Sequence, residues 1–209
     1  MPERAAGTGQ RVAALLAVLP PEGARRRLVA LAGPPAGGKS TLAAALSAAL
    51  AARGESAVVV PMDGFHLDNA VLRGRGLLSR KGAPETFDAE GFIALVTRLR
   101  QGAEVAIPLF DRQRDIAVAG AAIVPADCRT VIVEGNYLLF DAEPWRRLAA
   151  LWDLAVFLEE DEGELAARLV QRWRDHGLDA RAARQRAEAN DLPNARRILS
   201  ARLPATLVL

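Results

Sequence analysis

The chain has 209 residues, of which 51% are apolar and 25% charged, and its net charge is +2. These values are ordinary for a soluble globular protein. The small net charge gives no strong argument for nucleic-acid binding, and the single cysteine, Cys128, excludes a disulfide framework and a cysteine-based metal site. No apolar run has the length of a transmembrane helix. We therefore expect a cytoplasmic protein of one domain, without nucleic-acid or membrane partners, and leave a homodimer open.

The first 27 residues precede the first predicted strand and carry no motif. Residues 1–10 read as a loose tail. Apolar residues at helical spacing between Val12 and Leu19 predict an amphipathic helix ended by Pro20-Pro21, and not the core of a signal peptide. The arginine-rich segment 22–27 is expected to be a solvated lead-in to the first strand.

A phosphate-binding loop follows, because Gly33-Pro34-Pro35-Ala36-Gly37-Gly38-Lys39-Ser40 fits the pattern G-x-x-x-x-G-K-[ST]. The apolar run 28–32 predicts a buried strand before it, and helix formers from Ser40 to Arg53 predict a helix after it. Glycines let backbone N–H groups surround phosphate oxygens, and the helix N-terminus favours negative charge. Lys39 is then expected on the β- and γ-phosphates and the Ser40 hydroxyl on Mg²⁺.

A candidate catalytic base closes the second strand. The apolar run 57–62 ends in Asp63, and in a parallel sheet the carboxyl ends of the strands share one rim. A carboxylate at this rim can accept the proton of a substrate hydroxyl. The alternative is a turn or capping aspartate. Residues 67–87 read as an ordered loop with one short helix, and Asp88 is expected to cap a helix that ends near Arg100.

The next segment predicts a small antiparallel structure beside the main sheet. Residues 104–110 read as an edge strand because they contain a proline, and residues 111–115 as a charged turn. Residues 116–118 and 121–124 are candidate short strands, which we expect to pair antiparallel.

A candidate metal ligand closes a later strand. Residues 130–133 are a buried Thr-Val-Ile-Val run, and Glu134 follows directly. An acidic residue in this place is the Walker B arrangement, in which it holds Mg²⁺ or its water shell. An ordinary strand-end glutamate is the alternative, and the phosphate loop upstream weighs against it.

The remaining chain continues the alternation of strand and helix. The patterns predict a helix near 144–151, a strand at 154–158, helices at 162–176 and 180–189, an interruption at 191–194, a helix at 195–201 and a strand at 206–209. The alternation predicts an α/β fold with a mainly parallel sheet.

Arg168 and Arg172 lie four residues apart and so share one helix face. Phosphoryl transfer needs cations over the γ-phosphate, often from a segment that closes over the site. A solvated arginine face paired with Glu162 and Glu164 is an equal competitor, and both readings stay open.

Charged and polar loop residues are candidates for binding a polyhydroxylated or anionic acceptor. They are His66, Arg80, Lys81, Asp111, Arg112 and Arg114. Lys81 is notable because Lys39 is the only other lysine. The chain has no Asn-Lys-x-Asp motif for guanine recognition, which argues against a regulatory GTPase.

Several motifs together resemble the P-loop kinase family of uridine kinase, phosphoribulokinase and bacterial type I pantothenate kinase, and in particular short bacterial proteins described as fructose-transport-system kinases. The resemblance runs from about Leu28 to the C-terminus. It is carried by Gly33–Thr41, Met62-Asp63-Gly64-Phe65-His66, Arg75–Asp88, Pro108-Leu109-Phe110-Asp111-Arg112 and Val131-Ile132-Val133-Glu134-Gly135. Residues 75–88 are particularly similar to pantothenate kinase, whereas Asn136-Tyr137 and His66 depart from relatives.

The resemblance implies a three-layer P-loop fold with helices on both faces of the sheet and a small helical lid at about 162–190. It implies ATP and Mg²⁺ as cofactors, residues 33–41 as the nucleotide site, and Ser40 and Glu134 near the metal. It further implies catalytic roles for Asp63, Lys39, Arg168 and Arg172. His66, Lys81, Arg112, Tyr137 and Asn194 are expected near the acceptor.

The sequence thus predicts an ATP-dependent kinase that phosphorylates a hydroxyl of a small metabolite. A sugar or sugar derivative ranks first as acceptor, followed by pantothenate or a related alcohol and then a nucleoside. A nucleotide-binding regulator or ATPase switch that transfers nothing to a small molecule remains the alternative from a different class.

Overall fold

The computed structural model describes residues 7–23 and 25–209. Within these residues the main sheet has five strands in the order β2-β5-β1-β6-β7, and every neighbouring pair is parallel. The strands are β1 (Arg27–Ala32), β2 (Ala57–Pro61), β5 (Thr130–Gly135), β6 (Leu154–Phe157) and β7 (Leu207–Val208). The parallel sheet confirms the α/β class.

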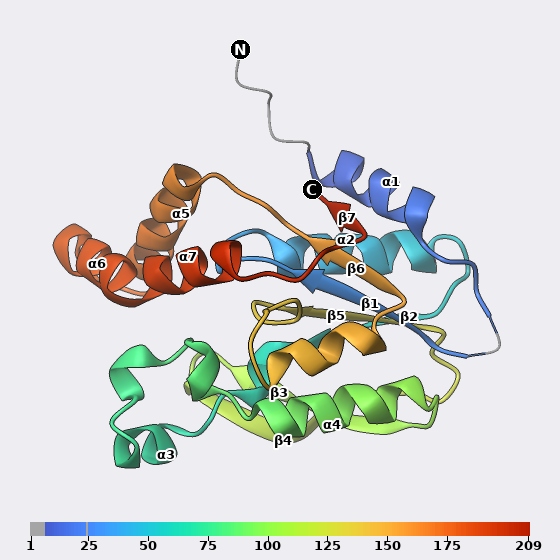
Figure 1. Cartoon of the computed structure of the whole chain (residues 1–209), viewed down its shortest axis with the longest axis horizontal. Helices are drawn as coiled ribbons and strands as arrows, with labels where there is room; N and C mark the ends of the chain where they lie inside the picture. The colour runs from blue at the N-terminus through green and yellow to red at the C-terminus, as the bar shows by residue number, and fades with distance from the viewer. Residues whose placement is uncertain (1–6, 24) are drawn as a thin grey trace.

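Helices cover both faces of this sheet, which gives three layers. Figure 1 shows α1 (Thr8–Val18) and α2 (Lys39–Ala51) above the sheet and α4 (Ala89–Arg100) below it. Side chains of a strand alternate between the faces. Accordingly Val29 and Leu31 of β1 join the core beneath α1 and α2, while Leu28, Ala30 and Ala32 join the core beside α4.

Strands β3 (Val105–Asp111) and β4 (Ile116–Val124) form a separate antiparallel sheet. The prediction of two short strands over residues 116–124 is wrong, because β4 is one strand that pairs along the length of β3. Their register shifts between Ile107 and Leu109. Pro108 lies at that shift, where its missing N–H removes a ladder hydrogen bond.

The predicted loop 67–87 is ordered by three short helical elements. Asp68 caps α3 (Asn69–Gly74) by accepting from the backbone N–H of Ala70, and two 3-10 turns follow at Leu78–Arg80 and Pro84–Thr86. Asp88 caps α4 as predicted, with its carboxylate accepting from the Gly91 N–H. The segment predicted as a helix at 144–151 is a 3-10 helix, Trp145–Leu151.

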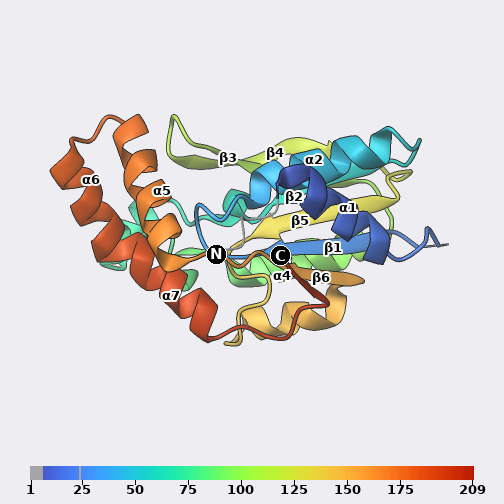
Figure 2. The same ribbon diagram turned by 90° about the horizontal axis from the view of Figure 1, so that it is seen from above.

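The last helices gather at one end of the molecule (Figures 1 and 2). They are α5 (Glu162–Asp175), α6 (Ala180–Arg186) and α7 (Leu192–Ser200). The predicted interruption at 191–194 is wrong. A π-helical turn, Ala187–Asp191, joins α6 to α7 without a break, and Pro193 stands in the first turn of α7, where a proline is tolerated.

The N-terminal predictions need two corrections. Residues 8–10 belong to α1, while the predicted tail at residues 1–6 lies outside the described part of the chain. Arg26 and Arg27 are buried and are not a solvated lead-in. The Arg26 guanidinium donates to backbone carbonyl oxygens, including those of Cys128, Leu99 and Pro125, and so replaces the water it loses. No helix among the described residues has the length and apolarity to cross a membrane.

Candidate active site

The phosphate loop leaves β1 and enters α2 at the carboxyl edge of the main sheet. Gly38 is the N-cap of α2 with φ +82°, a left-handed conformation that glycine adopts without strain. Gly33 packs against Leu158, directly after β6, where a Cβ would lie 2.7 Å from the Leu158 carbonyl oxygen. These contacts fix the loop backbone around the position that phosphate oxygens would take.

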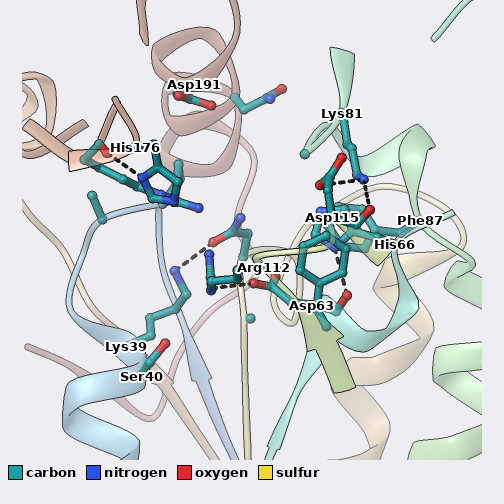
Figure 3. Close-up of a pocket in the computed structure, with 18 of the residues that line it drawn as sticks. Lys39, Ser40, Asp63, His66, Lys81, Phe87, Arg112, Asp115, His176 and Asp191 are labelled. Carbon is teal, nitrogen blue, oxygen red and sulfur yellow. Dashed lines mark hydrogen bonds and ion pairs between the residues drawn. The ribbon is translucent and has the colours of Figure 1, made fainter. Parts of the chain in front are cut away.

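Lys39 is buried and held inside this loop (Figure 3). Its ammonium donates to the Pro34 carbonyl at 2.8 Å and to Oδ1 of Asn136 at 2.7 Å. Burial lowers the pKa of Lys39 to about 8, although the carboxylates of Glu134 and Asp63 act in the opposite direction. Asn136 is therefore a site residue whose role the sequence did not indicate.

Asp63 and Glu134 reach the same edge because their strands are adjacent. Pro61 at the end of β2 pairs with Glu134 at the end of β5, which pairs in turn with Leu31 of β1. Asp63 follows in a 3-10 turn, Met62–Phe65. Its carboxylate accepts from Nη2 of Arg112 at 2.9 Å, so the predicted base is ion-paired.

Glu134 has an environment that suits a metal-binding carboxylate. Burial raises its pKa, opposed by the charge of Lys39 and a hydrogen bond from Ser40. Mg²⁺ prefers oxygen ligands and is commonly held by one or two carboxylates together with substrate phosphates. No group of three or more potential His, Cys, Asp or Glu ligands occurs in residues 7–23 and 25–209. Ser40 and Glu134 therefore fit an ion that is completed by nucleotide phosphates and water.

A cavity of about 900 Å³ joins the phosphate loop to the predicted acceptor residues (Figure 3). The predicted site residues that line it are Pro35, Ala36, Gly38, Lys39, Ser40, Thr41, Asp63, His66, Lys81, Arg112, Glu134, Arg172 and Asn194. Gly33, Pro34, Gly37, Tyr137 and Arg168 are not among its lining residues. One continuous space thus contains the nucleotide loop, the predicted base and most of the predicted acceptor residues.

Aromatic rings form one wall of the cavity. His66 packs between Phe87 and Phe110, with ring centroids 4.1 and 4.7 Å away and ring planes tilted by 43° and 40°. Its Nδ1 lies 2.8 Å from the Asp63 carbonyl oxygen. Burial lowers the pKa of His66, which favours a neutral imidazole in this wall.

The two predicted lid arginines differ in position. Arg172 lines the cavity, and burial followed by the nearby charge of Arg112 lowers its pKa. Arg168 is ion-paired with Glu160 and Glu164. Arg168 also reaches the phosphate loop, because its Nη1 donates to the Ala36 carbonyl at 3.5 Å, and Glu162 of the predicted ion-paired face pairs with Arg196 instead. Arg172 lines the cavity, and the lid role of both arginines stays a prediction.

Tyr137 lies behind the cavity wall. It is fully buried, and its hydroxyl donates to the Gly82 carbonyl at 2.6 Å. Asn190, in the π-helical turn, donates to the neighbouring Lys81 carbonyl at 2.9 Å. Both side chains therefore support the loop that carries Lys81, and Tyr137, which we expected near the acceptor, is not among the residues that line the cavity.

Not all of the charged loop residues predicted to bind the acceptor line the cavity. Arg80, Asp111 and Arg114 do not line the cavity, whereas Asn69 and Asp115 do. Within the charged turn at 111–115, Asp115 lines the cavity and Asp111 does not; Asp115 has a positive φ of +56°.

Comparison with known proteins identifies the family. Residues 28–198 match the model of the phosphoribulokinase/uridine kinase family. A structure from Silicibacter sp. TM1040, described as a putative fructose transport system kinase, is 57% identical, covers 98% of this chain and 99% of its own, and superimposes with a TM-score of 0.92.

Two sequence relatives agree with this match. "Uncharacterized protein YggC" of Escherichia coli K12 is 38% identical over 88% of this chain and 78% of its own. "Putative uridine kinase C227.14" of Schizosaccharomyces pombe is 36% identical over 81% and 77%, respectively. The chain therefore belongs to the phosphoribulokinase/uridine kinase family and is an ATP-dependent kinase of small molecules.

Proposed function

We propose that this kinase transfers the γ-phosphoryl group of ATP to a hydroxyl of a sugar or sugar derivative. The main support is the continuous cavity, which contains Lys39 at one end and an aromatic and amide-lined wall beyond Asp63. Aromatic faces and amide groups are suited to molecules that present both C–H faces and hydroxyls. The description of the Silicibacter relative as a putative fructose transport system kinase agrees with this acceptor class.

Asp63 is the proposed general base. It accepts the proton of the acceptor hydroxyl while that oxygen bonds to the γ-phosphorus, and the bond between this phosphorus and the β–γ bridging oxygen breaks to release ADP. Arg112 pairs with Asp63 at 2.9 Å, so it orients the carboxylate and lies close to the transferred group.

Cations on two sides of the phosphates would stabilise the transfer. Lys39 binds the β- and γ-phosphates from the loop, and Arg172 approaches from α5. Ser40 and Glu134 would hold Mg²⁺, which neutralises phosphate charge when bound. ATP as the donor also supports a cytoplasmic location.

The decisive experiment measures ADP release with purified protein across sugars, pantothenate and nucleosides, and identifies the product by mass spectrometry. We expect a sugar to raise ADP release well above the acceptor-free rate and Lys39→Ala to abolish it. Preference for pantothenate or a nucleoside would refute the sugar assignment while leaving the reaction intact. Absence of stimulation by any acceptor would favour a nucleotide-binding regulator.

A further inference from the structure

Lys81 is the cavity lysine that the sequence made a candidate ligand for the acceptor. An ammonium group has three N–H donors. In Lys81 they meet three oxygens: Oδ1 of Asn69 at 2.7 Å, the backbone carbonyl of Asp115 at 3.1 Å and Oδ1 of Asp115 at 2.8 Å. The Lys81 side chain is only 12% exposed. All of its donors are therefore engaged within the protein.

The partners of Lys81 also bind each other (Figure 3 shows Lys81 above Asp115). Asn69 donates through Nδ2 to Oδ2 of Asp115 at 2.7 Å. Burial alone would raise the pKa of Asp115, but hydrogen bonds from Asn69 and Lys81 outweigh it and lower that pKa. We call Asn69, Lys81 and Asp115 the wall triad. It is a closed, charge-neutral cross-link between α3 and the turn after β3.

The triad would oppose an acidic group on the acceptor. An anion that approached Lys81 would have to displace Asp115, whose carboxylate is half-exposed and would remain nearby as a like charge. Of the other cations that line the cavity, Arg112 and Arg186 are engaged, and the proposed function assigns Lys39 and Arg172 to the phosphates. Arg112 pairs with Asp63, and Arg186 donates to the Ser79 carbonyl and lies over Trp173.

From this wall we infer that the acceptor is an uncharged, hydroxyl-rich molecule, such as a sugar without a phosphate or carboxylate group, and that Lys81 is a structural cross-link and not an anion ligand. The inference rests on the proposed function and narrows its substrate class. His66 and the amides of Asn136 and Asn194 remain in the cavity as groups that can recognise hydroxyls without a charge.

The chain itself offers a direct test, because Lys39 and Lys81 are its only lysines. A protein labelled with ¹³C-lysine gives two side-chain signals, which Lys81→Met assigns. Titration with inorganic phosphate should shift the Lys39 signal, as an internal positive control, and leave Lys81 unchanged. In Asp115→Asn, where Lys81 loses its counter-charge, addition of phosphate should shift the Lys81 signal as well. A saturable Lys81 shift in the wild-type protein would overturn the inference.

Kinetics with matched acceptors test the same point. We compare kcat/KM for neutral sugars, fructose among them, with their phosphorylated and carboxylate counterparts, and expect at least about tenfold preference for the neutral member, equivalent to ~1.4 kcal/mol. Asp115→Asn should lower the ratio of kcat/KM for the neutral acceptor to kcat/KM for the charged one. Thermal unfolding checks that the variant is folded.

The outcomes separate the two proposals. A sugar phosphate preferred over its parent sugar overturns the neutral-acceptor inference but keeps the sugar kinase. A neutral nucleoside preferred over every sugar refutes the sugar kinase but keeps the inference, and preference for pantothenate refutes both. If no acceptor is phosphorylated, the lysine spectra alone decide the role of Lys81.

Discussion

At the scale of single residues, the proposed reaction depends on the positions of one carboxylate and one ammonium group. Asp63 lies in the turn after β2 and Lys39 at the start of α2, and both line the same cavity. Their neighbours set their properties: Arg112 pairs with Asp63, and Asn136 with Lys39.

Replacement of Asp63 tests its role as the base. Asp63→Asn keeps the shape of the side chain but cannot accept the proton, so we expect kcat to fall by about 10²–10⁴ with ATP affinity retained. Steady-state kinetics and nucleotide titration measure both effects. Asp127→Asn, at an exposed position, is the matched control. Unaltered kcat in Asp63→Asn would remove the residue from the mechanism.

The low pKa of Lys39 predicts a pH dependence. Below its pKa of about 8 the ammonium is charged and can bind phosphates, and above it the neutral amine predominates. We therefore expect kcat/KM for ATP to fall as the pH rises through about 8, because this parameter reports the free enzyme. A profile that stays flat to well above this pH would contradict it.

The same shift affects stability with a definite sign. An unfolded lysine has its ordinary pKa near 10.5, so between about pH 8 and 10.5 the unfolded chain binds more protons than the folded one. The contribution of Lys39 to the free energy of unfolding should therefore increase with pH over that window. Lys39→Ala should lack this increase in thermal unfolding measured across the same range.

At the scale of elements, the turn that carries Asp63 is fitted closely to β3. A Cβ on Gly64 would lie 2.7 Å from the carbonyl carbon of Pro108, which belongs to backbone and cannot rotate away. Only a glycine allows this approach, so the short distance between the turn and β3 also fixes Asp63 relative to Arg112, which follows β3.

Gly64→Ala should therefore lower both stability and activity. We expect a loss of roughly 1–3 kcal/mol, typical of overpacking, together with a lower kcat because Asp63 is displaced. Chemical denaturation and ADP release measure the two effects. Gly74→Ala is the control, since a Cβ there meets no atom within 4 Å. Equal behaviour of the two variants would show that the approach to Pro108 is unimportant.

At the scale of the whole molecule, the helices at one end are tied to the loop that carries Lys81. Asn190 donates to the Lys81 carbonyl, Arg186 to the Ser79 carbonyl, and Arg197 pairs with Glu85. Movement of α6 and α7 would therefore also move the segment 79–85 that carries Lys81.

Asn190→Ala should affect the acceptor site and leave the nucleotide site unchanged. Loss of its hydrogen bond frees the loop, so we predict a KM for the acceptor raised about three- to tenfold, the equivalent of the ~1 kcal/mol typical of a hydrogen bond, with little change in the KM for ATP. Initial-rate kinetics with each substrate varied in turn measure this. Ser200→Ala, on the exposed end of α7, is the control. A parallel rise in both KM values would indicate general loosening of the fold.

Local patterns in the sequence were sufficient for much of the architecture. The phosphate loop, the strand ends at Asp63 and Glu134, and the cap at Asp88 depend on neighbouring residues and on strand or helix periodicity. The parallel sheet followed from the order of these elements, because the ends of parallel strands meet at one edge.

Contacts between distant residues decided the rest. Arg26 is buried where carbonyl groups from two other segments, the end of α4 and the turn after β4, converge on it. Helix α6 continues into α7 through a π-helical turn. The sequence by itself predicted a phosphate-binding loop beside a carboxylate, because both depend on local patterns. Only the tertiary structure decided that the Lys81 ammonium donates to oxygens of Asn69 and Asp115, because these two residues lie 12 and 34 positions away in the chain.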